Sequence, residues 1–202
     1  MKMHQLSIVV VCAGALCGAA FAQESQASSP RISGTQPFHA TFSATTVNKD
    51  DFGFSTTPLF NGTSGAIRAS VTITGDSTHG RYSGQALFEA IYTSPFTSCT
   101  QPGGGSGIQS VYKGFVVVMT FHATQDQLFL ALSSGTDCFN PSVGISTGQA
   151  TFQVIGGTGR FEGATGTFTN PYKGIGLAAS ALGPNGFFNA VAGTFDGSIT
   201  LK

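Results

Sequence analysis

Charged side chains are scarce in this chain, which has nine Lys and Arg residues, nine Asp and Glu residues and a formal net charge of zero over its 202 residues. The basic residues form no cluster, so the chain lacks the electrostatic footprint that binding to nucleic acid requires. It also lacks a basic amphipathic helix of the kind that lies on a membrane surface. We therefore expect no nucleic acid among its partners.

The short motifs of metal and nucleotide sites are also missing. The chain contains no Cys-x-x-Cys or His-x-x-x-His spacing, which zinc sites commonly use. Asp50 and Asp51 stand together, but the oxygen ligands that a calcium loop needs do not follow them. The glycine-rich residues 156–166 break the dinucleotide-binding pattern, since Glu162 stands where its last glycine belongs. We expect no metal and no cofactor.

Long apolar runs are absent except at the N-terminus, where an apolar segment extends from Leu6 to Ala19 and Ala20-Phe21-Ala22 follows it. The segment has about 14–16 residues, fewer than the roughly 20 that span a bilayer. A short apolar segment followed by a small-x-small pattern is typical of a cleavable signal peptide. The sequence therefore predicts a signal peptide over residues 1–22, a secreted or periplasmic protein, and no stable membrane anchor.

Cysteine is rare as well. Cys12 and Cys17 fall within the predicted signal peptide, which leaves Cys99 and Cys138 in the mature chain. A pair of cysteines in an oxidising compartment is more often bridged than free. We expect a Cys99–Cys138 disulfide that closes a loop of about 40 residues.

Glycine and phenylalanine are abundant, with 28 and 18 residues. Residues 23–36 are rich in Ser, Gln, Gly and Pro and are predicted to be a flexible leader. Residues 37–202 are predicted to be a single β domain, because apolar and polar residues alternate as they do in half-buried strands. The predicted strands are 38–45, 67–74, 81–93, 110–123, 128–132, 147–155, 160–169 and 188–201.

Eight antiparallel strands can close into a barrel whose interior is filled by side chains or holds one small ligand. Closure removes sheet edges, which would otherwise invite aggregation in a chain with so little charge. We therefore predict an all-β fold, an eight-stranded antiparallel up-and-down β-barrel, with a β-sandwich as the alternative.

The lengths of the predicted links support the barrel. Links in an up-and-down barrel alternate between its two ends. The short links are 75–80, 124–127 and 156–159, and the long ones are 48–64, 94–108, 134–145 and 170–187. All long links therefore fall at one end, and they include both Cys99 and Cys138.

Residues 156–168 are predicted to form a glycine turn followed by a strand, with a weaker copy at Gly80–Gly84. Gly156, Gly157 and Gly159 are expected to supply positive φ angles in the turn. Gly163 and Gly166 fall within the predicted strand 160–169. Glycine inside a strand usually marks a bulge, a barrel corner or the close approach of a neighbour.

The run GGTGRFEGATG at 156–166 resembles the glycine-rich hairpin of the allene oxide cyclase-like and dirigent-like barrels. It is also similar to the hairpin of many small secreted bacterial proteins. The resemblance implies an eight-stranded antiparallel barrel and a possible homo-oligomer, since the plant members are often trimers. Those members handle hydrophobic small molecules, by cyclising an epoxide or guiding a radical coupling.

Two polar residues are candidates for catalysis. Glu89, between Phe88 and Ala90, could point into the barrel and serve as an acid or base; alternatively it faces water and pairs with a neighbouring strand. His122, near a strand end, could be a general base or a hydrogen-bonded structural histidine. His79 lies in a short turn and is expected to be solvated.

Aromatic residues gather in the links at the long-link end. At a barrel mouth they could form an apolar pocket for a ligand, or close the core as a plug that needs none. These residues are Phe52, Phe54, Phe60, Phe96, Phe139, Tyr172 and Phe187.

Three functions are consistent with these features. The first is a secreted, non-enzymatic barrel that binds a hydrophobic small molecule or a surface partner. The second, implied by the resemblance, is an isomerase or cyclase of the allene oxide cyclase type. The third is a structural envelope protein without a ligand. An apolar cavity would favour binding, an interior polar pair would favour the enzyme, and a filled interior would favour the structural role.

Overall fold

The structure, a computed structural model, describes residues 33–48, 66–92, 96–177 and 187–202. The described residues fall within one compact unit, Ile32–Lys202. Besides the strands, they contain a short 3-10 helix, η2, at Gly159–Phe161. The strands are β1 Gly34–Asn48, β2 Ala66–Ser77, β3 Gly80–Tyr92, β4 Ser98–Thr100, β5 Ser106–Phe121, β6 Gln127–Asn140, β7 Ile145–Gly157, β8 Thr165–Gly176 and β9 Phe187–Leu201.

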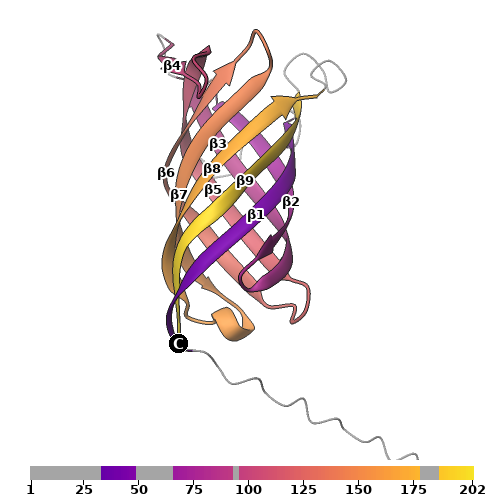
Figure 1. The fold of residues 1–202 in the computed structure, drawn as a ribbon, viewed down its shortest axis with the longest axis vertical. Helices are drawn as coiled ribbons and strands as arrows, with labels where there is room; N and C mark the ends of the chain where they lie inside the picture. Colours follow the sequence, from indigo (N-terminus) through magenta and orange to yellow (C-terminus); the bar gives the residue numbers. More distant parts are fainter. Residues whose placement is uncertain (1–32, 49–65, 93–95, 178–186) are drawn as a thin grey trace, which may run out of the picture. The chain divides into compact units, whose positions relative to one another are not determined.

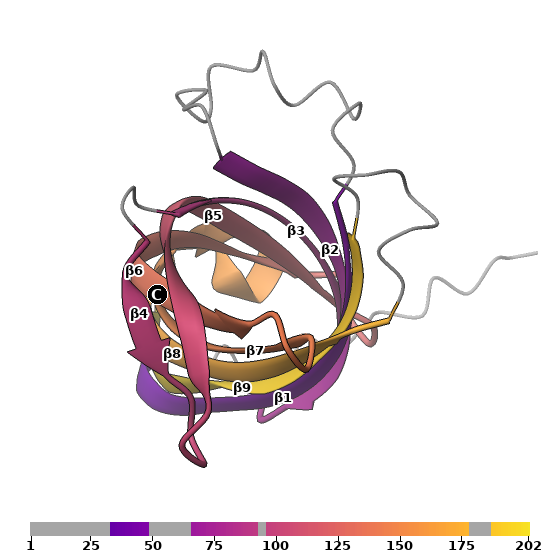
Figure 2. The same ribbon diagram turned by 90° about the horizontal axis from the view of Figure 1, so that it is seen from above.

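These strands form one closed antiparallel sheet (Figures 1 and 2). Their order is β3-β2-β1-β9-β8-β7-β6-β5-β4, and a further pairing of β3 with β5 closes the ring. The ring has eight strands, and β4 is an additional short strand on β5. The structure therefore confirms the predicted eight-stranded up-and-down barrel, not the sandwich.

The links alternate between the two ends as predicted. Residues 78–79, 122–126 and 158–164 connect strands at the end where β1 begins and β9 ends. We call this the short-turn end. The other end, where β6 meets β7 and β4 lies (Figure 1), is called the open end.

Several predicted boundaries are wrong. β1 begins at Gly34, inside the predicted leader 23–36, because Gly34 pairs with Leu201 at the end of β9. The predicted strand 128–132 is too short and the predicted link 134–145 too long, since β6 runs to Asn140 and only residues 141–144 separate it from β7. The predicted strand 160–169 begins only at Thr165.

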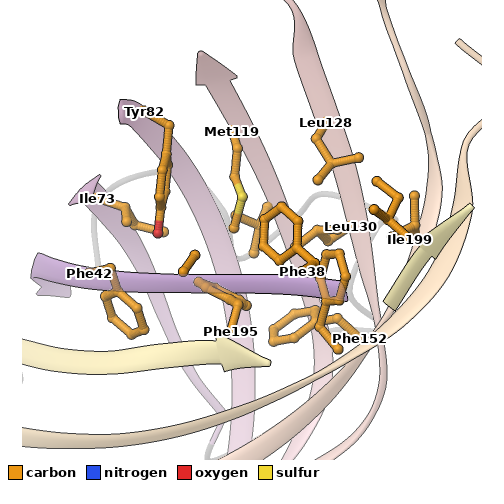
Figure 3. Packing of buried hydrophobic residues seen from close by; sticks show 14 of the residues in the cluster. Phe38, Phe42, Ile73, Tyr82, Met119, Leu128, Leu130, Phe152, Phe195 and Ile199 are labelled. Atoms are coloured by element: carbon orange, nitrogen blue, oxygen red, sulfur yellow. The ribbon is translucent and has the colours of Figure 1, made fainter. Parts of the chain in front are cut away.

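Buried apolar side chains pack together inside the barrel (Figure 3), and phenylalanine is prominent among those near the short-turn end. Phe38 stacks on Phe168 with 4.3 Å between ring centroids, and Phe121 lies 4.8 Å from Phe161. Phe152 is also fully buried. Each such side chain stabilises the fold by about 1.5–3 kcal/mol through the area removed from water. This half therefore supplies the packed core.

The glycine run is part turn and part strand. Gly156 and Gly159 have the expected positive φ angles of 125° and 56°. The expectation of a positive φ at Gly157 is wrong. Gly163, predicted inside a strand, also has a positive φ of 66° and lies in the turn before β8. Gly166 lies in β8, where a Cβ would collide with the Ser198 carbonyl oxygen, so close approach explains it.

η2 places Arg160 over the filled half. Its guanidinium lies 4.9 Å from the centre of the Phe121 ring and 4.8 Å from that of Phe161. It donates a 2.9 Å hydrogen bond to the His79 carbonyl oxygen and pairs with Asp126 at 3.5 Å. Arg160 therefore covers the aromatic core at the short-turn end through its charge and its flat face.

The predicted disulfide joins Cys99 of β4 to Cys138 of β6, with 5.9 Å between Cα atoms. Both cysteines lie in strands and not in loops, but at the same end of the barrel as expected. Gly107 of β5 leaves room for the bridge, since a Cβ there would lie 2.8 Å from the Cys138 sulfur. Gln101 adds hydrogen bonds of 2.9 and 2.8 Å to the carbonyl oxygens of Cys138 and Ile145.

The bridge yields a stability prediction. Replacing both Cys99 and Cys138 by serine is expected to lower the free energy of unfolding by about 2–4 kcal/mol, because the unfolded chain regains conformational freedom. Urea denaturation of the oxidised protein and the double variant measures this. A reductant should shift the midpoint of the wild type but not that of the variant. Equal midpoints for the two proteins would contradict the prediction.

Gly159 and Gly163 have similar φ angles, 56° and 66°, so substitutions at these two positions can be compared directly. A valine at either position adopts an unfavourable left-handed backbone, which costs about 1–2 kcal/mol. At Gly159 the new Cβ also collides with the Asp126 carboxyl group, whereas at Gly163 it meets the flexible Lys202 Cδ at 3.1 Å. Gly159→Val should therefore lower the denaturation midpoint more than Gly163→Val. A larger effect at Gly163 would show that the Asp126 contact does not matter.

Candidate functional site

The half of the barrel near the open end is hollow. It encloses a cavity of about 470 Å³. Aromatic and aliphatic side chains make up most of the wall. The described apolar residues lining the cavity are Phe42, Ala44, Val71, Ile73, Phe88, Ala90, Phe115, Val117, Phe139, Pro141, Leu177, Phe188, Val191 and Phe195.

The hollow follows from the residues at inward positions. Near the short-turn end these positions carry rings such as Phe38 and Phe168, which stack on each other over Gly197 of the strand between them. Near the open end many of them carry small side chains or none, so opposite walls do not meet. These small lining residues are Ala44, Thr46, Ala90, Ser110, Gly144, Ser146, Gly174 and Gly176.

A chain of three polar side chains interrupts the apolar wall. The Tyr172 hydroxyl of β8 donates a 2.6 Å hydrogen bond to Asp137 Oδ1 of β6. The Tyr112 hydroxyl of β5 lies 2.5 Å from the Tyr172 hydroxyl. Because Tyr172 has one hydroxyl proton and gives it to Asp137, Tyr112 is the donor in the second bond. We call these residues the Tyr-Tyr-Asp chain.

Two β-bulges turn this chain inward. In β6, Leu130 and Asp137 both face the interior although they are an odd number of residues apart. A register shift between Leu132 and Ser134 reverses the alternation between them. In β5, Tyr112 and Phe115 both line the cavity, although they are three residues apart. The reason is a register shift where β5 pairs with Glu89 and Ala90 of β3. Bulges often re-aim side chains next to functional sites.

Two glycines make room for the tyrosine rings. Asp137 pairs with Gly148 of β7, and Gly148 pairs with Tyr172 of β8, so the three lie in one row across the sheet. A Cβ on Gly148 would collide with the Tyr172 hydroxyl, which therefore reaches Asp137 only across a residue without a side chain. A Cβ on Gly135 would lie 2.9 Å from Tyr112 Cδ2.

Burial sets the pKa values of the side chains in the Tyr-Tyr-Asp chain. Asp137 is only 9 % exposed. Its burial raises the pKa of the carboxyl from 3.8 to about 6, although hydrogen bonds from Tyr172 and Ser146 act in the opposite direction. Burial also raises the pKa of Tyr172 well above its ordinary value, and the nearby Tyr112 and Asp137 add to this. The pKa of Tyr92, another lining residue, rises to about 12, mainly through burial.

Two of the seven aromatic residues expected at the mouth, Phe139 and Tyr172, line the cavity. Phe96 is 70 % exposed and contacts the edge of Tyr92 at 6.2 Å between centroids. Phe187 is the first residue of β9, and its side chain lies outside what the structure describes. Phe52, Phe54 and Phe60 lie outside the described residues.

Glu89 does not line the cavity, although both of its neighbours, Phe88 and Ala90, do. It is 1 % exposed and accepts a 2.7 Å hydrogen bond from Arg68 Nε of the neighbouring strand β2. The expected pairing with a neighbouring strand is therefore present, but the expected exposure to water is wrong. An ion-paired carboxylate away from the cavity has no access to a ligand there.

The two turn histidines lie at the short-turn end, away from the cavity. His122 is exposed, its backbone N–H donates to the Arg81 carbonyl oxygen at 3.0 Å, and it follows the end of β5. His79 is partly buried against Phe38 and Phe161, so the expectation that it is solvated is wrong. Burial, with the Arg160 charge, lowers the pKa of His79.

Comparison of the chain with protein-family models and with curated proteins gives no match. Among the described residues, no group of three or more His, Cys, Asp and Glu residues could hold a metal ion. In the same parts of the chain, no helix is long and apolar enough to cross a membrane. The cavity and its polar chain are therefore the observations that bear on function.

Sequence reasoning missed Asp137 and Tyr112. Asp137 falls in the stretch 134–145, which was expected to be a link because Ser, Gly and Asp replace the apolar side of the alternation. Asp137 faces a cavity and not a core, and Ser134 is exposed, so this part of the strand lacks the usual hydrophobic signal. The single available clue was the spacing of glycines near polar residues, as at Gly135 and Gly148.

The raised pKa of Asp137 makes stability depend on pH. The folded protein binds this proton more tightly than the unfolded chain, so Asp137 contributes stability below pH 4 that is lost as the pH rises through about 6. Asp137→Asn removes this loss. The variant should gain up to about 3 kcal/mol relative to the wild type between pH 4 and pH 7.

Urea denaturation of both proteins across this range measures the difference. The contribution of His79 to the pH dependence cancels in this comparison, because it is the same in both proteins. The lowered pKa of His79 makes stability change with pH in the direction opposite to that of Asp137. Asp76→Asn, which changes a carboxylate that is 69 % exposed, is the matched control. A difference between wild type and Asp137→Asn that stays constant with pH would contradict the prediction.

Proposed function

We propose that this protein is a secreted barrel that binds a hydrophobic small molecule within the cavity at its open end. The observation that carries the proposal is a mostly apolar cavity of about 470 Å³ whose wall carries the Tyr-Tyr-Asp chain and a few other polar side chains. Small-molecule sites are typically of this size, mostly apolar, and equipped with a few polar groups that fix the ligand's orientation.

The division of the interior supports binding over a purely structural role. A structural barrel gains most stability when side chains fill its interior to the density of a protein core. Here the half with Phe38, Phe121 and Phe168 is filled in this way, whereas the half with Ala44 and Ala90 is not. An unfilled apolar interior loses packing contacts, and a ligand would restore them.

Export is the second part of the proposal. Its support is the apolar segment Leu6–Ala19 followed by a small-x-small pattern, which is typical of a signal peptide. The Cys99–Cys138 bridge is compatible with it, because disulfides persist in oxidising compartments.

A second candidate function is an isomerase or cyclase of the allene oxide cyclase type, and the Tyr-Tyr-Asp chain favours it. A buried carboxylate can act as a base, and a tyrosine hydroxyl can stabilise charge that develops on a ligand oxygen. The resemblance of residues 156–166 to the hairpin of those enzymes points the same way. Conversion of a bound ligand, and not binding alone, would distinguish this candidate.

Filling the cavity tests the leading proposal. Ala44 is buried and lines the cavity, so Ala44→Phe should place a ring where the ligand would lie. We expect wild-type protein to bind 6-phenylhexanol, a neutral apolar probe, and Ala44→Phe to bind it at least about tenfold more weakly, because contact area is lost. Isothermal titration calorimetry measures both affinities.

Ala192→Phe is the matched control, because Ala192 is an exposed residue of β9 and the same ring is added there. It should bind the probe like the wild type. Native mass spectrometry of protein purified from its own source should also show a retained small molecule. If the wild type binds no probe and retains no ligand, the structural role replaces the proposal.

A further inference from the structure

The cavity has an unbalanced charge. Among its described lining residues, Asp137 is the single ionisable carboxyl group, and no Lys, Arg or His accompanies it. The groups that face Asp137 are Tyr112 from β5, Tyr172 from β8, Tyr92 from β3 and Ser146 from β7. All four are neutral, so nothing in the described wall compensates the carboxylate with positive charge.

This situation differs from that of Glu89, the second buried carboxylate among the described residues. Glu89 is also almost fully buried, but Arg68 pairs with it at 2.7 Å. A buried carboxylate without a cation is unfavourable, because water no longer solvates its charge. The hydroxyl groups of Tyr172 and Ser146 offset part of this cost, since hydrogen bonds to the charged form favour it.

We infer that the cavity takes an amphiphilic organic cation, a small molecule with an apolar body and one ammonium group that lies against Asp137. This inference rests on the proposed function, because it specifies the chemical class of the ligand that the cavity binds. The ligand's ammonium group supplies the positive charge that the described wall lacks, and its apolar body fills the space between the rings and the small side chains.

The direction of the hydrogen bonds supports a donor at this point. With Asp137 ionised, the proton of Tyr172 points to the carboxylate and that of Tyr112 points to Tyr172. The chain therefore offers a ligand only lone pairs, on the carboxylate and on the Tyr112 oxygen. An ammonium group has only donors and fits this arrangement, whereas a ligand carboxylate would meet a like charge.

The ring cluster that contains Tyr112, the tyrosine at the end of the Tyr-Tyr-Asp chain, supports a cation as well. Phe88, Tyr112 and Phe115 form a cluster with centroids 5.3 to 5.4 Å apart, and all three line the cavity. Ring faces attract cations, and they do so more strongly when water is excluded. The carboxylate and the aromatic wall therefore favour the same kind of ligand group through two different interactions.

Three probes with the same apolar body test the inference: 6-phenylhexylamine, 6-phenylhexanol and 6-phenylhexanoate. Calorimetry at pH 7.5 on the full chain should show the amine binding about tenfold or more tightly than the alcohol, with the acid weakest, because charge-assisted hydrogen bonds are the strong ones. Asp137→Asn should bring the amine to the affinity of the alcohol. Asp76→Asn, which changes an exposed carboxylate, should leave the order unchanged.

A pH series on the wild type gives an independent test that does not depend on the folding of a variant. The affinity for the amine should fall as the pH is lowered through about 6, where Asp137 takes up its proton, while the affinity for the alcohol stays level. An amine affinity that does not change with pH would overturn the inference.

The two proposals fail in different ways. If the alcohol binds as tightly as the amine, or the acid binds tightest, the cation inference is wrong and the binding function stands. If none of the three probes binds, the cation inference is wrong, and the binding function is wrong too if the purified protein retains no small molecule. An amine preference that survives in a folded Asp137→Asn variant also overturns the inference.

Discussion

Closure of the sheet through the pairing of β3 with β5 is the constraint on which the rest of the structure depends. Once the ring is closed, each strand has one face toward the interior, and every residue is assigned to the inside or the outside. Two bulges, in β5 and β6, then change that assignment locally. They bring Tyr112 and Asp137 to the inside near the open end, so the site depends on closure together with its two irregularities.

The barrel itself could be predicted from the sequence because many of its strands follow the simple rule of alternation. The alternation of apolar and polar residues in segments such as 38–45 and 67–74 predicts strands. The alternating link lengths indicate that the strands follow one another in an up-and-down order. The cysteine pair was predicted from composition and compartment alone. The strands, their order and the cysteine pair could be predicted because each depends on residue types and spacings along the sequence and not on the register between strands.

The candidate site could not be predicted in the same way. Asp137 and Ser146 occupy inward positions that face a hollow, so they lack the hydrophobic signal of a strand, and a bulge removes the regular period as well. The Tyr172–Asp137 contact spans two strands across Gly148 and depends on register, which the sequence does not state. The apolar neighbours of Glu89 suggested that its side chain could point into the barrel. Its ion pair with Arg68 of the adjacent strand depends on the register and could not be predicted from the sequence.

The placement of tyrosine has a spectroscopic consequence. The chain has no tryptophan and four tyrosines, so its near-ultraviolet emission comes from tyrosine. Tyr92, Tyr112 and Tyr172 line the cavity, and Tyr82 lies in the filled half. A phenol that donates to a carboxylate emits weakly, because its excited state readily loses the proton to that acceptor. Because three of the four tyrosines line the cavity, the intrinsic fluorescence of the unlabelled protein is expected to respond mainly to changes in the cavity, over a contribution from Tyr82 in the filled half.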